Sequence, residues 1–291
     1  MHKIEYYVVR TLLFIFSNIS IRTGKWIAMA VYLFTAYIVR YRKKVILQNL
    51  TRVFGEDLPM PLSRLVKGIY RNFIFLWMEF LQNSRLRKEG IENRVKFHNF
   101  KLLEEALKKK RGVVIVSGHM GNFEWLGQAV GISGHRVSGI AKRQSNRYVN
   151  DLIEKNRSLD NVSVIYKANA IEDALNAMRN HNEIIGIVAD QNAHKRGITV
   201  DFLGQPSSTA VGPVILHMRS DAPILFGISI RKDYGVFDCY FEEIAMELAQ
   251  KPDVELIPEM TQQHAAMLEK WIYKYPEQWF WMHHRWGKKQ L

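Results

Sequence analysis

A histidine and a glutamate lie five residues apart in the segment from Gly118 to Glu124. An imidazole with a pKa near 6.5 acts as a general base at neutral pH, and a carboxylate bonded to its second nitrogen stabilises the imidazolium that forms. Residues five apart on a regular helix point about 140° away from each other. His119 and Glu124 therefore meet only if His119 lies in a turn and Glu124 begins the next helix. A structural hydrogen bond is the alternative for such a pair.

The segments around this pair favour the catalytic interpretation. Short runs of β-branched residues alternate with stretches of helical length such as 146–157 and 170–180, which predicts an α/β fold with a mostly parallel central sheet flanked by helices. Ligands bind at the carboxyl ends of parallel strands. The pair directly follows one such run, so we expect it at an active-site edge. The predicted strands are 113–116, 137–140, 162–165, 184–188 and 224–230.

No protein nucleophile or metal site accompanies the pair. Cys239 is far away along the chain, and no G-x-S-x-G motif is present. The ten histidines show no H-E-x-x-H or similar spacing, so we predict no metal. A histidine and a glutamate without an enzyme nucleophile are suited to direct deprotonation of a substrate hydroxyl.

Composition and net charge restrict the classes of molecule that this chain is expected to bind. The chain has 291 residues, 47% of them hydrophobic, and a net charge of +13. A hydrophobic fraction of this size predicts a folded body, and the charge requires an anionic partner. The basic residues are scattered and no nucleic-acid recognition motif accompanies them, so we expect no nucleic-acid binding. A single cysteine excludes an internal disulfide and fits a reducing compartment.

The N-terminal residues 1–45 are predicted to be a membrane anchor. Two apolar runs, 4–21 and 26–39, precede a cluster of basic residues at 40–44. A spanning helix needs about 20 apolar residues, so the two runs together form either one tilted span or a shallow hairpin broken at 22–25, with the basic cluster on the cytoplasmic side. A buried helical hairpin is the alternative. Residues 46–291 are expected to form one catalytic α/β domain, helical up to about residue 110.

Several ordered segments resemble one family over nearly the whole chain. The block from His119 to Glu124 looks like the H-x4-D/E motif of glycerolipid acyltransferases, within the lysophospholipid acyltransferase-like superfamily. More closely, the chain resembles the bacterial lipid A biosynthesis acyltransferases, which transfer lauroyl and myristoyl groups. The other matching segments are 40–50, 142–157, 189–192, 202–204 with Thr209, and 276–286.

The resemblance implies a role for the pair and an activity. His119 would take the proton from an acceptor hydroxyl as it attacks a thioester carbonyl, and Glu124 would orient His119. The implied reaction is O-acyl transfer from acyl carrier protein to a lipid A precursor at the cytoplasmic face of the inner membrane, in lipopolysaccharide biosynthesis. It implies no bound cofactor. An acidic carrier protein also suits a chain of net charge +13.

The resemblance also implies substrate-binding residues. Arg143 and Arg157 are candidates for binding phosphate or the developing oxyanion, with a solvated surface charge as the equal alternative. Asp190 and Gln191 end a predicted strand and would line the same cleft, unless Asp190 only caps a turn.

Two departures from the family pattern leave the acceptor open. The segment 141–144 reads Ala-Lys-Arg-Gln where Tyr-Arg-Pro is common, and Asn192 replaces an acid. A phosphoinositide mannoside, an aminolipid or a lysophospholipid is an alternative acceptor. A non-catalytic protein that binds anionic membranes is a further alternative from a different class.

Overall fold

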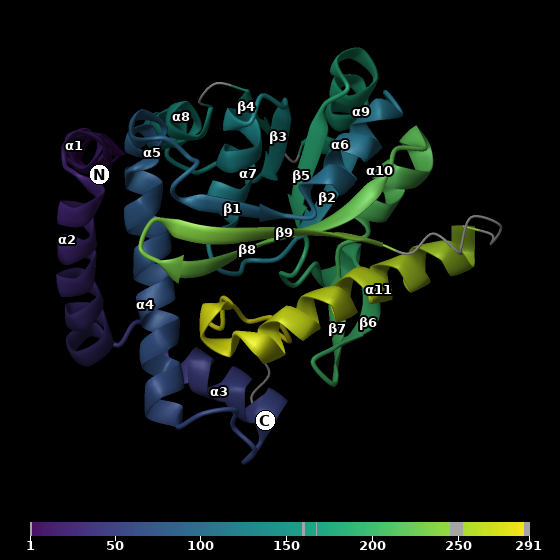
Figure 1. Cartoon of the computed structure of the whole chain (residues 1–291). Helices are drawn as coiled ribbons and strands as arrows, with labels where there is room; N and C mark the ends of the chain where they lie inside the picture. Colours follow the sequence, from purple (N-terminus) through teal and green to yellow (C-terminus); the bar gives the residue numbers. More distant parts are fainter. Residues whose placement is uncertain (1, 159–160, 167, 245–252, 288–291) are drawn as a thin grey trace.

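A mixed sheet of seven strands forms the centre of the structure, a computed structural model that describes residues 2–158, 161–166, 168–244 and 253–287 (Figure 1). The strand order is β1-β9-β8-β2-β5-β3-β4. The five predicted strands are confirmed and run parallel to one another, whereas β9 is antiparallel to β8. A separate hairpin contains β6 and β7. The strands are β1 (Val95–His98), β2 (Val113–Ser117), β3 (Val137–Ala141), β4 (Val162–Tyr166), β5 (Ile184–Val188), β6 (Ile198–Phe202), β7 (Gln205–Thr209), β8 (Ile224–Asp233) and β9 (Val236–Glu243).

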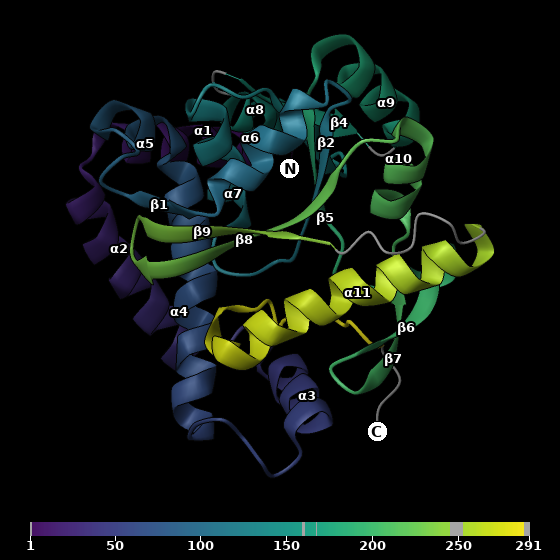
Figure 2. The same ribbon diagram turned by 45° about the vertical axis from the view of Figure 1, so that its right-hand side comes forward.

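Helices cover both faces of the sheet. Helices α6 and α7 pack on one face, and α9, α10 and α11 cover the other (Figures 1 and 2). The predicted α/β fold is therefore confirmed. The helices are α1 (His2–Asn18), α2 (Ile21–Phe34), α3 (Lys43–Phe54), α4 (Leu62–Leu81), α5 (Asn83–Glu89), α6 (Phe100–Lys108), α7 (Phe123–Ile132), α8 (Arg147–Arg157), α9 (Ala170–His181), α10 (Gly212–Ser220) and α11 (Asp253–Lys274), with a π-helix at Thr35–Val39 and 3-10 turns at His194–Arg196 and Pro276–Gln278.

Strand β2 lies at the centre because it is apolar on both faces. Val114 and Val116 pack toward α9, α10 and α11, whereas Val113 and Ile115 pack toward α6 and α7. All four side chains are almost completely buried. A strand that is buried on both faces has a continuous apolar sequence. Because β2 is held on both faces, the turn that follows it has a fixed position.

The region from 46 to 110 was predicted to be helical, but it also contains a strand. It contains α3, α4, α5 and α6, but the short strand β1 lies between α5 and α6 and pairs in parallel with β9. A four-residue strand carries little periodic signal, and its pairing partner lies 142 residues further along the chain, since Val95 pairs with Phe237. Only the tertiary structure brings the two together.

The N-terminal residues fold into two helices that pack against the rest of the chain. No helix among the described residues is both long and apolar enough to cross a membrane. The break between the apolar runs lies at Ile19 and Ser20 rather than at 22–25, and Ser20 caps α2 by accepting a hydrogen bond from the Thr23 amide. Gly24 allows α2 to approach α4 closely, because a Cβ there would lie 2.2 Å from the side-chain oxygen of Gln82.

Helix α4 carries a buried ion pair that joins it to the β8–β9 hairpin. Glu79 and Arg231 are paired at exposed side-chain fractions of 1% and 7%. Asn122, at the start of α7, donates to Glu79 at 2.7 Å, and the amide of Gly235 donates to it at 2.8 Å. Arg231 also donates to Asn72 at 3.0 Å. A buried pair with these additional partners ties three parts of the fold together.

We predict that Glu79→Gln lowers the free energy of unfolding by about 3–5 kcal/mol, because it leaves Arg231 buried without a counter-charge. Equilibrium denaturation by guanidinium chloride in detergent measures the change. Glu172→Gln is the matched control: Glu172 pairs with Arg219 on the surface, so this substitution should leave the free energy of unfolding nearly unchanged. Equal losses in the two variants would contradict the structural role of the buried pair.

Candidate active site

A tight turn carries His119 from the end of β2 to the start of α7. Gly121 adopts a φ of +56°, and a Cβ at this position would lie 1.8 Å from the carbonyl oxygen of Ser229. Only glycine fits there. Asn122 then begins α7, since its side chain accepts a hydrogen bond from the Trp125 amide at 3.1 Å. The predicted arrangement of strand, turn and helix is therefore present.

The C-terminal segment 276–286 holds this turn from the other side. The Gly121 amide donates to the Gln278 carbonyl at 3.0 Å, and the Phe280 amide donates to the His119 carbonyl at 3.0 Å. Met120 forms an isolated antiparallel bridge with Trp279. The turn is thus fixed by backbone hydrogen bonds to residues about 160 positions further along the chain.

Asp190 is the carboxylate that binds His119. It follows β5, the neighbour of β2, so its side chain lies beside the turn. One carboxylate oxygen lies 2.6 Å from Nδ1 of His119, and the other accepts from the His119 amide at 2.8 Å. Trp279 donates its indole N–H to the same second oxygen at 2.8 Å. Asp190 therefore positions both the backbone and the ring of His119.

The ionisation of Asp190 decides which ring nitrogen carries the proton. Burial alone would raise the pKa of Asp190, but the charge of His119 and the hydrogen bonds from His119 and Trp279 outweigh it and lower the pKa to about 2. An ionised carboxylate only accepts hydrogen bonds, so Nδ1 of His119 is the donor. In the neutral ring, Nε2 then has a free lone pair and is the basic atom.

Gln191 lies next to the basic nitrogen. Its side-chain nitrogen is 3.1 Å from Nε2 of His119 and donates to it in this tautomer. The side chain of His119 remains 20% exposed. The rings of Phe123 and Phe280 flank the imidazole, with centroids 4.8 Å and 6.2 Å from it. Nε2 of His119 is therefore partly accessible, lies between two aromatic rings, and contacts an amide side chain that a substrate hydroxyl can displace.

The predicted contact between Glu124 and His119 is absent from the described residues, and Glu124 pairs with Arg157 instead. It lies in the first turn of α7, and Arg157 at the end of α8 donates to its two oxygens at 3.0 Å and 2.5 Å. Burial lowers the pKa of Arg157, but Glu124 outweighs this effect and the net pKa is raised, so Arg157 stays charged. The expected role of Glu124 toward His119 is taken by Asp190, because β5 lies beside β2 and brings Asp190 to Nδ1.

Arg143 lies at the same edge of the sheet, beyond the end of β3. Its guanidinium carbon lies 4.3 Å from the centroid of the Tyr166 ring, at the end of the adjacent strand β4. The Tyr166 hydroxyl accepts a hydrogen bond from Asn150 at 2.7 Å and donates to Glu154 at 2.5 Å. Arg143 is exposed and forms no ion pair within the described residues. It presents a positive charge at the edge that also holds Asp190.

The sequence pattern did not identify the supporting residues of this site. Trp279 and Phe280 belong to the matching segment 276–286, for which the sequence analysis named no site residue. Trp279 is buried and donates to Asp190. His283 accepts a hydrogen bond from the Asn192 amide at 3.2 Å, and burial lowers its pKa to about 4, so it is neutral. Within the described ranges no three acidic, histidine or cysteine side chains form a potential metal site.

Asp190 should contribute about 2 kcal/mol to stability above pH 4, because its pKa falls from 3.8 to about 2 on folding. A lowered carboxyl pKa stabilises the folded state above the unfolded pKa, and this contribution is lost as the pH falls through the folded pKa. We predict that the difference in unfolding free energy between wild type and Asp190→Asn shrinks by this amount between pH 6 and pH 2. Asp151→Asn, an exposed carboxylate on α8, is the control. A difference that stays constant with pH would contradict the assignment.

Comparison with known proteins gives the family of the chain. The model of the bacterial lipid A biosynthesis acyltransferases matches residues 5–288. The lipid A biosynthesis palmitoleoyltransferase of Escherichia coli (strain K12) is 23% identical over 263 residues, which cover 85% of this chain and 79% of the relative. The lipid A biosynthesis acyltransferase of Shigella flexneri matches with the same identity and coverage. The resemblance seen in the sequence is thus confirmed, and the chain belongs to the bacterial lipid A biosynthesis acyltransferase family.

Proposed function

We propose that this acyltransferase transfers a fatty acyl group from acyl carrier protein to a hydroxyl of a lipid A precursor. The observation that carries the proposal is the hydrogen bond of 2.6 Å between His119 and Asp190 at the carboxyl edge of the sheet, in a chain of this family. This pair leaves a basic nitrogen facing a partly accessible site. No protein nucleophile is needed, because the acceptor itself supplies the hydroxyl.

In the proposed reaction, His119, paired with Asp190, first takes a proton from the acceptor hydroxyl and later gives it to the leaving thiolate. Nε2 of His119 takes the proton of the acceptor hydroxyl while its oxygen attacks the thioester carbonyl, and Asp190 stabilises the imidazolium that forms. The tetrahedral intermediate then collapses with cleavage of the carbon–sulfur bond. The imidazolium returns its proton to the leaving thiolate. The products are an ester and the free thiol of the carrier.

Gln191 and the two arginines are the proposed substrate contacts. The amide of Gln191 gives way to the acceptor hydroxyl at Nε2 and is then free to donate to the developing oxyanion. Arg157 uses two of its nitrogens on Glu124, which leaves one terminal nitrogen for a phosphate oxygen. Arg143 is held over Tyr166 and supplies a second positive charge. Glu124 thus fixes the direction of Arg157.

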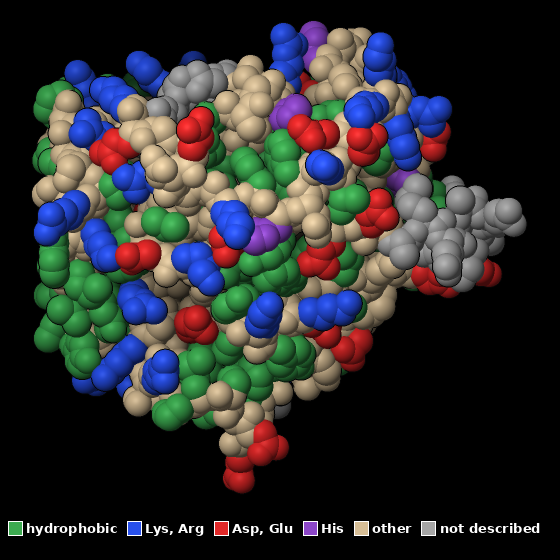
Figure 3. Space-filling model, viewed as in Figure 1, with side chains coloured by type: hydrophobic (Ala, Val, Ile, Leu, Met, Phe, Trp, Pro, Cys, Tyr) green, Lys and Arg blue, Asp and Glu red, His purple; other side chains and the backbone are tan. Residues whose placement is uncertain are grey.

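The N-terminal helices form the proposed membrane contact. Apolar side chains on α1, α2 and the π-helix point outward, with exposed fractions of 69% for Phe14, 68% for Trp26 and 69% for Ile38. Figure 3 shows hydrophobic side chains gathered at the lower left of the molecule, over α2, with lysine and arginine beside them. Such a surface binds at the lipid interface by inserting apolar groups between anionic headgroups. We place it on the cytoplasmic side of the inner membrane, where the carrier protein is available.

We predict that His119→Ala lowers the rate of acyl transfer by at least about 100-fold, the lower end of what a general base contributes. Mass spectrometry of a tetra-acylated lipid A precursor incubated with acyl carrier protein and enzyme should show a gain of one acyl chain with wild type only. His181→Ala, an exposed histidine at the end of α9, is the matched control and should keep full activity.

Two outcomes would overturn parts of this proposal. A mass gain with His119→Ala equal to that of wild type would remove His119 as the base. No gain with folded, membrane-bound wild type would remove lipid A as the acceptor and direct the search to a phosphoinositide mannoside, an aminolipid or a lysophospholipid.

The double variant Trp26→Glu, Ile38→Glu should bind at least about tenfold more weakly to vesicles of phosphatidylethanolamine and phosphatidylglycerol. Each substitution places a charge where an apolar side chain would enter the interface. Vesicle flotation measures the bound fraction. Val254→Glu is the control, because Val254 is 77% exposed on α11, away from the N-terminal helices. Equal binding of both variants and wild type would remove this surface as the membrane contact.

A further inference from the structure

A group of unpaired basic side chains lies on the surface next to the candidate active site. We call it the basic surface, and it consists of Arg42, Lys43, Arg52, Lys195 and Arg196. Four of the five are exposed, and Arg52 is half-buried. None of them forms an ion pair with another described residue, whereas several surface cations elsewhere pair with carboxylates. Their positive charge is therefore available to an external anion.

Segments far apart in the sequence form the basic surface. Arg42 and Lys43 lie at the start of α3 and Arg52 lies near its end, whereas Lys195 and Arg196 lie in the 3-10 turn between β5 and β6. The C-terminal segment passes between α3 and the β6–β7 hairpin (Figure 2). None of the ranges 40–55, 191–200 and 278–287 contains an aspartate or a glutamate. The positive charge in these segments is thus not balanced locally.

The C-terminal segment connects the two halves of the basic surface. Arg42 donates a hydrogen bond to the Met282 carbonyl at 2.9 Å, and the guanidinium carbon of Arg52 lies 5.9 Å from the centroid of the Trp286 ring. On the other side, the Asn192 amide donates to His283 at 3.2 Å. Both halves are therefore attached to the same short stretch of chain.

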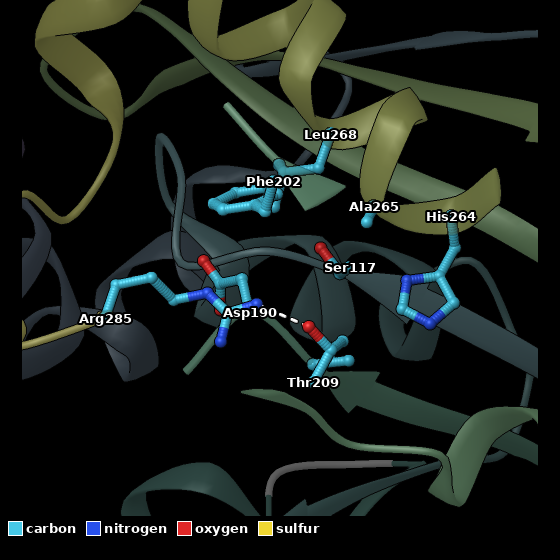
Figure 4. A pocket seen from close by; sticks show the side chains of 9 residues that line it. Ser117, Asp190, Phe202, Thr209, His264, Ala265, Leu268 and Arg285 are labelled. Atoms are coloured by element: carbon cyan, nitrogen blue, oxygen red, sulfur yellow. Dashed lines mark hydrogen bonds between the residues drawn. The ribbon is translucent and has the colours of Figure 1, made fainter. Parts of the chain in front are cut away.

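The buried side chain of Arg285 fixes the half that contains Lys195. Its terminal nitrogens donate to the Gln191 carbonyl at 3.3 Å and to the Thr209 hydroxyl at 2.5 Å (Figure 4). One of them also donates to the Ser208 carbonyl at 2.5 Å, and the Ser208 hydroxyl donates to the carbonyl of His194 at 2.6 Å. The 3-10 turn therefore has a fixed position relative to Gln191.

The basic surface lies close to the reacting atoms. The side chain of Gln191 contacts Nε2 of His119 at 3.1 Å, and Lys195 follows Gln191 by four residues. Four residues of fully extended chain span at most about 14 Å. The Cα atoms of Gln191 and Lys195 are therefore no further apart than that, and a partner bound to Lys195 lies beside the base.

The side chains of the basic surface favour a soluble protein over a membrane as the partner. A surface that enters the lipid interface carries exposed large apolar side chains, as α1, α2 and the π-helix do. Within the ranges 42–55, 191–200 and 278–287 no large hydrophobic side chain is exposed. Positive charge without exposed apolar groups attracts and orients an acidic protein.

We propose that the basic surface is the docking site of the acidic acyl carrier protein, which presents its thioester to His119 from there. The inference rests on the proposed function, because that function requires an acidic carrier as the donor. Ile38 of the proposed membrane contact precedes Arg42 by only four residues. The carrier and the membrane thus bind to adjoining parts of the chain, on either side of residue 40.

The double variant Lys43→Glu, Lys195→Glu reverses one exposed charge in each half of the basic surface. Neither side chain makes a hydrogen bond or an ion pair within the described residues, so the fold should be unaffected. We expect the KM for the acyl carrier to rise at least about tenfold with kcat unchanged, because electrostatic attraction raises association rates by about 10- to 1000-fold. The KM of wild type should rise with ionic strength, and that of the variant should not.

Lys101→Glu, Lys109→Glu is the matched control. These lysines lie at the two ends of α6, are exposed, and give the same change in net charge. The control should keep the KM of wild type. An equal KM in both double variants, or a fall in kcat without a change in KM, would overturn the docking site.

A binding measurement tests the site without the reaction. Fluorescence anisotropy of labelled acyl carrier protein with the full chain in detergent should give a Kd at least about tenfold higher for Lys43→Glu, Lys195→Glu than for wild type and the control. No binding by wild type, or equal affinity of all three proteins, would overturn the proposal. Binding that depends on these lysines, without acyl transfer to lipid A, would refute the proposed acceptor alone.

Vesicle flotation tests anionic lipid as the other partner. On vesicles of phosphatidylethanolamine and phosphatidylglycerol, Lys43→Glu, Lys195→Glu should be bound as fully as wild type. Loss of vesicle binding with unchanged affinity for the carrier would overturn the proposal and assign the basic surface to the membrane.

Discussion

The carboxylate of Asp190 is the group on which the rest of the site depends. It accepts hydrogen bonds from the backbone and the ring of His119 and from the indole of Trp279. These donors belong to the turn after β2 and to the C-terminal segment, while Asp190 itself follows β5. A single buried anion thus joins three separate parts of the chain and also sets the tautomer of the base.

Two carboxylates near the start of α7 have different partners and therefore different properties. Asp190 faces the imidazole, and its negative charge favours a proton on Nδ1. Glu124 faces Arg157, whose charge it balances and whose direction it fixes. The neighbouring strand supplies the first carboxylate and the following helix supplies the second. In the proposed reaction, Asp190 supports proton transfer and Glu124 supports the binding of substrate charge.

The C-terminal segment is part of the candidate active site, because it contacts both Asp190 and the turn that carries His119. The side chain of Gln278 accepts a hydrogen bond from the Arg231 amide and donates one to the Arg231 carbonyl on β8. Asn49 on α3 donates to the carbonyls of Trp281 and His283. These contacts hold the segment against the turn that carries His119. Because the partners are backbone carbonyls and amides, these hydrogen bonds fix the C-terminal segment relative to β8 and α3.

The sequence by itself determined the parallel strands, the turn that carries His119, and the position of Asp190 and Gln191 just after a strand, through apolar runs, glycines and residues that end strands. The family, and Arg143 and Arg157 as candidate site residues, came from the resemblance of ordered segments and not from local pattern. Only the tertiary structure decided that Asp190 binds His119 and that Glu124 binds Arg157. Strand order places β5 beside β2, and hydrogen-bond partners depend on that order, which no local periodicity encodes. The ion pair of Glu79 and Arg231 depends on the same long-range packing.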